Sequence, residues 1–370
     1  MTNSDICELN AMVTHRLASM WDHKEQLCCR RLILTGQGPV SDGLPPRCTI
    51  MALLGFRELE RVGGGSGFES QLIFERFIRD TGWIGFAGDL GLLMWLAAEF
   101  APEQLKGLFL RLECATALDR YPDAKQARTT EMSWFLAGVS HAALASPQMI
   151  PELTDIAADA YHLLEENQGE SGLFGHASRR KSLSGFFKGR IGNFADQIYP
   201  IYALSKFATA FNVNEPLAAA LKCARALHDT DGESSQWSWL YDSRTGKEVS
   251  RYPAYPVHQH GTAPLGFIAL EEASGQNFQQ PIYKGFKSIS GNGTHGEYIR
   301  DIRLPLTWHG IGPAHRLTNL LREAQSLLRG LKTASEVMEG NIIFDHRPCE
   351  LGLLLYAFAG YLRKQATSAV

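Results

Sequence analysis

Six long apolar stretches recur along the chain, and most of them follow a loop rich in glycine and aromatic residues. Nearly every position within a stretch is apolar, so the hydrophobic side chains surround the expected helix instead of forming a stripe on one face. A helix of this kind is buried on all sides, as the inner helices of a helical barrel are. The stretches begin at Arg47-Cys48-Thr49, Gly88-Asp89, Thr130-Glu131, Ala195-Asp196, Gln259-His260 and Cys349-Glu350.

Amphipathic segments lie between these stretches, with apolar residues at helical spacing. Alternation of a buried and an amphipathic helix, repeated at roughly forty residues or more, predicts helix pairs that close into a ring. Strand signals are sparse by comparison. The expected outer helices span residues 72–79, 103–119, 152–166, 216–228 and 315–331.

A recurring turn precedes several inner helices and combines an acidic or amide residue, a glycine and an aromatic. Glycine permits the turn, and the aromatic ring fills the gap between neighbouring hairpins. The four examples are 80–83 (DTGW), 168–174 (QGESGLF), 231–237 (DGESSQW) and 339–344 (EGNIIF).

In these residues the chain resembles the six-hairpin (α/α)6 toroids, which include many glycoside hydrolases, polysaccharide lyases and sugar epimerases. The squalene-cyclase-like toroids are the neighbouring resemblance. The similarity covers most of residues 48–363 and implies an all-α toroid with long loops at its mouth. We expect one domain over residues 1–370, in which 1–46 form a helical segment packed on the barrel and 47–363 form the repeat core.

Polar residues stand at the start of the inner helices, and in such a ring these starts gather at one mouth. An acid in the first turn of a helix is stabilised by the helix dipole by ~0.3–1 kcal/mol, so a single example needs no catalytic explanation. Five of the six stretches begin with an acidic residue or a histidine, which favours a shared site. The remaining stretch carries Thr49 at this position. The five are Asp89, Glu131, Asp196, His260 and Glu350.

These side chains are compatible with more than one reaction. Two carboxylates across a sugar carry out glycoside hydrolysis, with Asp196 the first candidate because it follows the most polar loop, and Asp89 the second. His258 and His260 suggest a rival route, in which two histidines move a proton off and onto carbon, as in sugar epimerases of this architecture. Elimination from a uronate, with Tyr255 and an arginine, is a third possibility.

Two long loops, 172–195 and 237–260, carry aromatic and cationic residues that suit a carbohydrate site. Sugar rings stack on flat aromatics, and guanidinium groups bind carboxylates, so we expect an anionic substrate. The alternatives are aromatics that only seal the rim and a basic segment that is a solvated surface loop. The expected substrate-binding residues are His176, Arg179, Arg180, Arg190, Tyr199, Trp237, Trp239, Tyr252, Tyr255 and Glu350.

Composition excludes several classes of partner. The net charge of −3 and the pI near 6.5 argue against a general nucleic-acid binder. Polar residues interrupt every apolar run before twenty, so we expect no membrane span. Seven scattered cysteines and an N-terminus without a basic start or apolar core suggest a reduced, cytoplasmic protein. No ligand cluster accompanies the His258–His260 pair, so we expect neither a metal nor a cofactor.

One glycine run, 63–67 (GGGSG), superficially suggests a nucleotide-binding loop. No strand precedes it, so we interpret it as a flexible loop between helices.

The sequence therefore predicts a cytoplasmic carbohydrate-active enzyme that acts on an acidic sugar or oligosaccharide by carboxylate or histidine acid–base catalysis. Hydrolysis, elimination and epimerisation remain open, as does the oligomeric state. The first alternative is an isoprenoid cyclase-like toroid acting on a prenyl diphosphate, although the DxDD and DDxxD patterns of terpene cyclases are missing from the sequence. The second is a non-catalytic binding or scaffold toroid.

Overall fold

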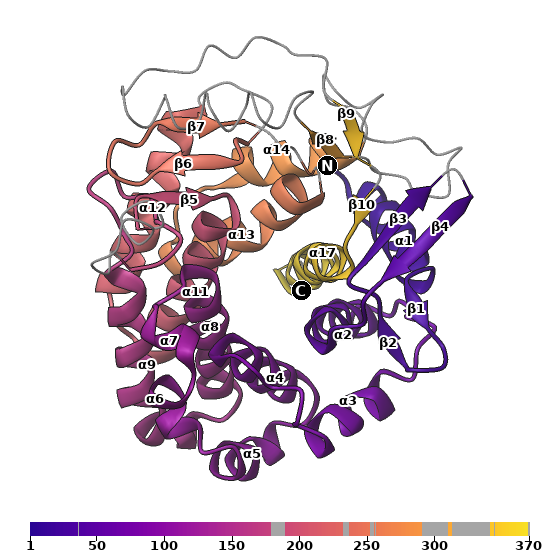
Figure 1. Ribbon diagram of the computed structural model, residues 1–370, viewed down its shortest axis with the longest axis horizontal. Coiled ribbons are helices and arrows are strands. Elements are labelled where there is room, and N and C mark those ends of the chain that lie inside the picture. Colours follow the sequence, from indigo (N-terminus) through magenta and orange to yellow (C-terminus); the bar gives the residue numbers. More distant parts are fainter. Residues whose placement is uncertain are drawn as a thin grey trace.

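The computed structural model describes residues 1–35, 37–178, 189–231, 237–251, 255, 257–290, 310–312, 341–343 and 345–368. In this part of the chain, inner helices form a ring and outer helices surround them (Figure 1). The inner helices are α2 (Pro46–Arg61), α4 (Ala87–Phe100), α8 (Thr129–Ala145), α11 (Ala195–Phe211), α13 (Thr262–Ser274) and α17 (Pro348–Ser368). The outer helices are α1 (Asn3–Ala18), α3 (Ser70–Arg79), α5 (Leu105–Arg111), α9 (Ile150–Glu165), α12 (Glu215–Asp231) and α14 (Gln279–Ile289).

Contacts between the inner helices close the ring. Each inner helix packs against the next along the chain, and α17 packs against α2. The inner helices are buried almost all round, as their composition predicts: in α4 every residue except Glu99 is buried. Burial of nearly complete helix surfaces supplies the hydrophobic free energy that holds the ring together. The fold is an (α/α)6 toroid, and this prediction is confirmed.

The predicted inner-helix starts are confirmed to within a few residues. The largest difference occurs before α13, where residues Val257–Gly261 form a π-helical turn. Such turns are rare and frequently occur at functional sites.

The outer helices agree less well with the prediction. The segments 72–79, 152–166 and 216–228 are confirmed as α3, α9 and α12, and 315–331 lies outside the described residues. One continuous helix over 103–119 is wrong, because Glu113 takes a left-handed φ of +47° after α5 ends. The segment instead contains α5 with three short helices around it: η1 (Pro102–Gln104), η2 (Cys114–Thr116) and α6 (Ala117–Arg120). Two further short helices are α7 (Pro122–Lys125), which follows α6, and η3 (Pro147–Met149), which precedes α9.

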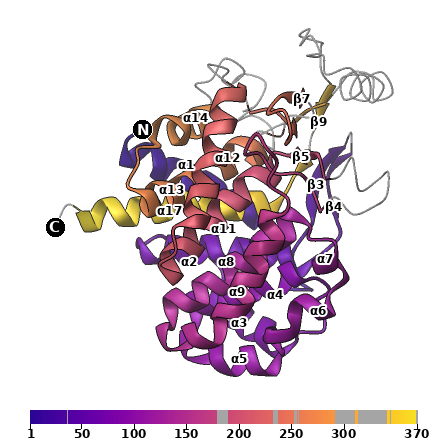
Figure 2. The ribbon, with the colours of Figure 1, turned by 90° about the vertical axis from the view of Figure 1, so that its left-hand side faces the viewer.

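Short antiparallel strands lie at the end of the ring where the inner helices begin (Figure 2). One sheet has the order β5-β6-β7, a second has the order β10-β3-β4, and two further pairs are β1-β2 and β8-β9. Their bounds are β1 (Trp21–Asp22), β2 (Leu27–Cys28), β3 (Arg31–Thr35), β4 (Gly38–Asp42), β5 (Ile191–Asn193), β6 (Leu240–Asp242), β7 (Glu248–Ser250), β8 (Gly310–Gly312), β9 (Asn341–Ile343) and β10 (Asp345–His346). We call this end the mouth.

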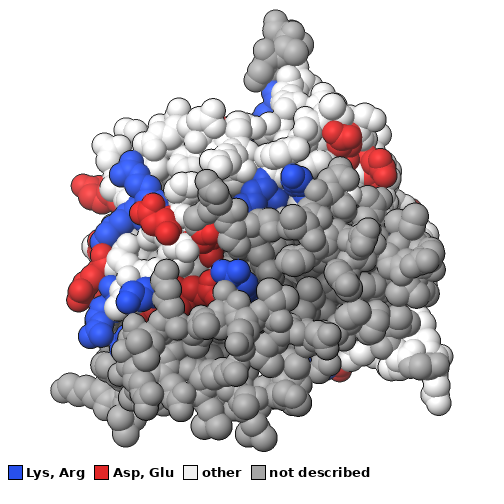
Figure 3. Space-filling model, turned by 90° about the horizontal axis from the view of Figure 1, so that it is seen from above, with Lys and Arg blue, Asp and Glu red and all other residues white. Residues whose placement is uncertain are grey.

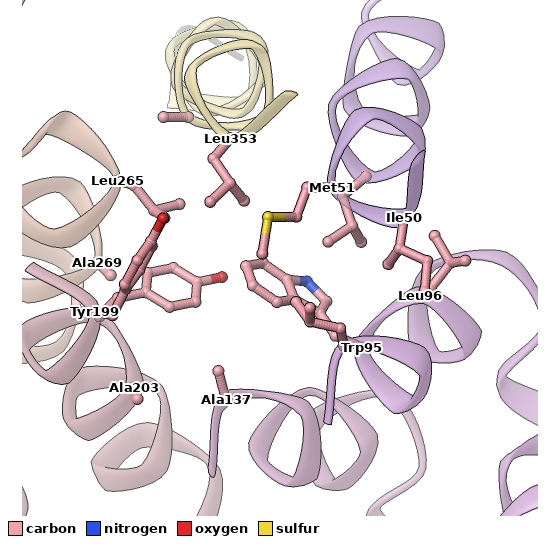
Figure 4. Packing of buried hydrophobic residues seen from close by; sticks show 14 of the residues in the cluster. Ile50, Met51, Trp95, Leu96, Ala137, Tyr199, Ala203, Leu265, Ala269 and Leu353 are labelled. Carbon is pink, nitrogen blue, oxygen red and sulfur yellow. The ribbon is translucent and has the colours of Figure 1, made fainter. Parts of the chain in front are cut away.

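Large side chains fill the centre of the ring. Trp95, Tyr199, Met51 and Leu353 lie in the space enclosed by the inner helices (Figure 4). All four are at most 6% exposed. The barrel is therefore a packed core and not an open channel.

Charged residues on the described part of the face in Figure 3 are of both signs and interspersed. Among the described residues, none of the helices combines the length and apolar character that a membrane crossing requires.

Candidate active site

Arg47 joins three inner helices at the mouth. Its Nη2 lies 2.7 Å from Asp89 Oδ1 and its Nη1 lies 3.1 Å from Glu131 Oε1, so one guanidinium holds the first-turn acids of α4 and α8. The guanidinium also lies over the ring of Trp134, 5.4 Å from its centroid. Burial raises the pKa of Asp89, although Arg47 and the backbone N–H of Gly85 both favour its ionised form.

Asp196, at the start of α11, is completely buried. Thr130 Oγ1 donates to its Oδ1 at 3.0 Å, and His176 Nδ1 lies 3.1 Å from its Oδ2. The Asn193 N–H donates to Asp196 Oδ2, and Asn193 Oδ1 accepts from the Asp196 N–H in return. Asp196 thus exchanges hydrogen bonds with Asn193 just before the helix and contacts an imidazole at the same time.

A second histidine–carboxylate pair lies between α13 and α17. His258 Nδ1, in the π-helical turn, is 3.0 Å from Glu350 Oε1. The Trp239 ring lies 5.4 Å from the His258 ring and 5.5 Å from that of Tyr255. Arg347 lies over Tyr255 at 5.1 Å and 3.7 Å from Glu350. Two aromatic rings, an imidazole, a carboxylate and a guanidinium therefore form one wall.

These contacts continue around the mouth. Arg47 connects α2 with α4 and α8, and Thr130 connects α8 with α11. Phe194, between β5 and α11, connects to the second pair: its N–H donates to the carbonyl of Trp239 at 3.0 Å, and the Trp239 ring contacts His258. The structure thus brings together Asp89, Glu131, Asp196, His176, Trp239, Tyr255, His258 and Glu350 at the mouth.

Other predicted site residues lie in the scaffold. Trp237 is 3% exposed and packs between Phe194 and Phe267, so it is a core residue. Arg190 Nε donates to Asp242 Oδ1 at 2.9 Å and ties β5 to β6.

Tyr199 and His260 are also buried. Tyr199 lies inside the barrel, where burial raises the pKa of its hydroxyl well above its ordinary range. His260 is 3% exposed in the π-helical turn, and it is His258 that meets Glu350. Arg179, Arg180 and Tyr252 lie outside the described residues.

Sequence reasoning missed the two arginines. Arg47 occupies the first turn of the first inner helix, the place where the other repeats carry acids, and that position is the signal that could have identified it. Arg347 directly precedes α17, and nothing in the apolar pattern marks it.

In the part of the chain that the structure describes, no group of three or more His, Cys, Asp and Glu side chains is arranged to hold a metal ion.

No protein-family model matches this chain, and no curated protein sequence matches it either. Solved structures do share its fold. A cellobiose 2-epimerase from Bacillus thermoamylovorans superposes with a TM-score of 0.64 at 10% identity, covering 97% of this chain and 100% of the other. An unsaturated glucuronyl hydrolase from Bacillus sp. GL1 gives 0.62 at 13% identity, covering 96% of each chain.

A sugar epimerase from a ruminal bacterium gives a TM-score of 0.59 at 12% identity, covering 90% of this chain and 100% of the other. These proteins are (α/α)6 toroids that act on carbohydrates. At such identities the likeness establishes the fold of this chain.

Proposed function

We propose that this protein is a carbohydrate-active enzyme that moves protons on a sugar with two histidine–carboxylate pairs. The observation that supports the proposal is the presence of both pairs, His176–Asp196 and His258–Glu350, at one mouth. A carboxylate beside Nδ1 can orient an imidazole. His176 Nδ1 has hydrogen-bond geometry to Asp196, whereas His258 Nδ1 lies 3.0 Å from Glu350 Oε1 without it. The Trp239 and Tyr255 rings offer faces on which a sugar can stack.

Proton transfer at carbon suits this arrangement best. One imidazole removes the proton from the carbon beside the sugar carbonyl, the resulting enediolate forms, and the other imidazole returns a proton to the opposite face. The product is the epimer, and no atom other than the exchanged proton enters or leaves. Each of the four mouth carboxylates lies within 3.1 Å of a guanidinium or an imidazole.

Hydrolysis is the second candidate, favoured by one observation. Burial raises the pKa of Asp89, and a carboxyl group with a raised pKa can serve as a general acid. In that case Asp89 protonates the glycosidic oxygen, while a second mouth carboxylate activates water.

We further propose that the substrate is an acidic sugar and that the protein works in the cytoplasm. The basic residues Arg179, Arg180, Lys181 and Lys188 in the sequence support an acidic substrate. The seven cysteines, none of them in a disulfide, support the cytoplasm.

A deuterium experiment separates the reactions. The protein is incubated in D₂O with reducing sugars and uronate disaccharides, and the products are analysed by NMR and mass spectrometry. Epimerisation introduces deuterium at carbon and inverts that centre, whereas hydrolysis releases a shorter sugar without deuterium at carbon. Preference for the uronates, weakened by added salt, is the result expected for an acidic substrate.

Variants assign the roles. His176→Gln and His258→Gln should each lower turnover by about 10²- to 10⁴-fold, the usual contribution of a proton-transfer group, with little change in melting temperature. Asp196→Asn should also lower turnover, because the amide that replaces the carboxylate has no negative charge to stabilise a protonated His176. The matched control is His162→Gln, since His162 is exposed on α9 and faces Glu165 at 3.6 Å. Activity that survives both histidine changes and disappears only in Asp89→Asn would instead establish the hydrolytic route.

A further inference from the structure

Two cysteines meet where the first inner helix packs against the last. The helices α2 and α17 lie side by side (Figure 1), and we call the contact between them the seam. Cys48 lies in the first turn of α2 and Cys349 in the first turn of α17. Both cysteines therefore lie at the mouth, although they come from opposite ends of the chain.

The backbones of the two helices touch along the seam. A Cβ added at Gly352 of α17 would overlap the Met51 carbonyl of α2, and a Cβ added at Gly55 would overlap the Gly352 carbonyl. Both helices begin at the mouth, so they run parallel. Residues three apart share a face of a helix, so Cys48 lies one turn nearer the mouth than Met51. Cys349 lies one turn nearer the mouth than Gly352, and the two cysteines face each other.

The thiols of these cysteines are in contact, because Cys349 makes a side-chain hydrogen bond with Cys48. Cys48 is 4% exposed, whereas Cys349 is only partly buried. A disulfide needs Cα atoms about 4.4–6.8 Å apart, which requires closely packed backbones. The glycines at the seam provide that packing. One thiol can thus be reached from solvent, and the other lies beside it.

The surroundings of Cys349 determine which oxidants suit the pair. The hydrogen bond to Cys48 and burial raise the pKa of the Cys349 thiol well above its ordinary range, and the Arg347 guanidinium opposes them. Because the thiolate is the reactive form of cysteine, oxidation is favoured by a mildly alkaline solution. A small oxidant also fits this confined site better than a bulky disulfide does.

We propose that Cys48 and Cys349 are a redox modification site, at which hydrogen peroxide introduces a disulfide across the seam. The Cys349 thiolate attacks one peroxide oxygen, the O–O bond breaks and hydroxide leaves, so that Cys349 becomes a sulfenic acid. The Cys48 thiolate then attacks this sulfur, the S–O bond breaks and a second hydroxide leaves. The two thiol protons convert both hydroxides to water. Two electrons pass from the thiols to the peroxide, and a dithiol reductant restores the pair.

The disulfide would hold the first turns of α2 and α17 together. These turns also carry Arg47 and Glu350, so the modification lies next to the mouth. A bond between distant parts of a chain restricts the unfolded state, so the oxidised protein should be the more stable form. The proposal does not depend on the function proposed for the mouth.

Peptide mapping of the full chain tests the pairing. The reduced protein is treated with hydrogen peroxide at pH 8.5, the remaining thiols are blocked with N-ethylmaleimide in urea, and the digest is analysed by mass spectrometry. We expect a peptide pair that joins Cys48 to Cys349, lighter by two hydrogen atoms than the separate peptides, and that dithiothreitol separates. Peroxide treatment in urea should give mixed pairings, because only the folded protein holds these thiols together.

The melting temperature tests the effect on the fold. Oxidation should raise it by about 5 °C, because the disulfide closes a very long loop. Cys48→Ala and Cys349→Ala should each abolish the joined peptides and this increase. Cys7→Ala is the matched control: Cys7 is exposed on α1, so this variant should keep both.

Three results would overturn the proposal. The first is a folded protein that yields no joined peptides, whether its thiols stay free or Cys349 is oxidised further to a sulfinic acid. The second is a main link from Cys349 to Cys28, which lies beside α2 and whose N–H donates to Thr49 Oγ1 at 2.8 Å. The third is a link between Cys48 and Cys349 that forms equally well in urea. If an alanine variant does not fold, the peptide map of the wild type decides the question alone.

Discussion

At the scale of single residues, Arg47 of α2 organises two acids of the mouth, because its guanidinium contacts both Asp89 and Glu131. Asp89 and Glu131 could be found because each stands at the start of an apolar stretch, a position that repeats along the chain. Arg47 could not be assigned in this way, because its role comes from contacts with helices that follow it by about forty and eighty residues. A contact between residues far apart in the sequence leaves no local sequence pattern.

The histidines illustrate a second limit. Apolar periodicity placed the start of the fifth inner helix at His260, and an α-helix beginning there would direct His260 into the mouth. In the structure residues Val257–Gly261 form a π-helical turn, and His258, two residues earlier in the chain, lies beside Glu350. Such a change in helical winding has no signature in the hydrophobic pattern.

His141 should make the stability of the fold depend on pH. Its ring stacks on Trp95 with 4.6 Å between centroids, its Nε2 lies 2.7 Å from Tyr202 Oη, and burial lowers its pKa to about 3 from an ordinary 6.5. Between these values the unfolded chain binds a proton that the folded protein does not, so stability falls as the pH is lowered through this window. The contribution amounts to about 1 kcal/mol between pH 7 and pH 5.5.

His141→Phe, which retains a ring against Trp95, tests this contribution by urea unfolding at several pH values. The variant should be less stable than the wild type at pH 7.5, because Tyr202 loses a hydrogen bond, and the difference should shrink by about 1 kcal/mol by pH 5.5. Burial raises the pKa of Asp231 to about 6, so this group stabilises the folded protein as the pH is lowered. Its contribution is the same in the wild type and in the variant and cancels in the difference. A difference that stays constant with pH would show that His141 does not carry the effect.

At the scale of the elements, inner helices were easier to predict than outer ones. An inner helix is buried all round and its sequence is nearly uniform, whereas an outer helix has only a stripe that short irregularities interrupt. The helix α14 went unpredicted: it contains Pro281 and Gly285, both of which weaken a helical pattern. In the structure Gly285 faces the His260 carbonyl, so close packing accounts for the glycine.

Glycine pairs set the distance between adjacent inner helices. A Cβ at Gly138 of α8 would overlap the carbonyl group of Gly91 on α4, and a Cβ at Gly352 of α17 would overlap the backbone of Met51 on α2. Backbones that approach this closely bring the helix starts together, which places the acids of α4 and α8 within reach of one arginine.

Gly138→Ala should therefore destabilise the fold by about 3 kcal/mol, because the obstacle is backbone and cannot rotate away. Gly107→Ala is the matched control: Gly107 lies exposed in α5, and an added Cβ meets nothing within 4 Å. That change should stabilise the protein by ~0.5–1 kcal/mol through helix propensity. Urea unfolding measures both, and equal effects of the two substitutions would contradict the packing argument.

At the scale of the whole molecule, ring closure depends on contacts between distant parts of the chain. The repeats predict a series of hairpins, and a series can form either an open superhelix or a closed ring. Closure depends on α17 meeting α2, a contact between segments about 300 residues apart in the sequence. Closure was predicted from the alternating helix pattern together with the resemblance to known toroids, and the structure supplies its physical basis in the Gly55–Gly352 approach and in the ion pairs around Glu58.

Glu58 offers a direct test of closure. Its carboxylate, 1% exposed on α2, pairs with Arg61 of the same helix and with Arg363 of α17, so it joins the first inner helix to the last. Removing one partner of a fully buried ion pair typically costs about 3–5 kcal/mol. The side chains of Arg61 and Arg363 are 30% and 47% exposed and can turn toward water when the partner is lost, which reduces the cost.

We therefore expect Glu58→Gln to destabilise the protein by about 1–3 kcal/mol in urea unfolding. Glu152→Gln serves as the control, because Glu152 pairs with Lys106 at 2.7 Å on the surface, where such pairs contribute about 0–1 kcal/mol. High salt should reduce the effect of Glu152→Gln more than that of Glu58→Gln, since Glu58 is shielded from solvent ions. If the two variants lose the same stability, the ion pairs around Glu58 do not close the ring, and the helix contacts at Gly55 and Gly352 must do so alone.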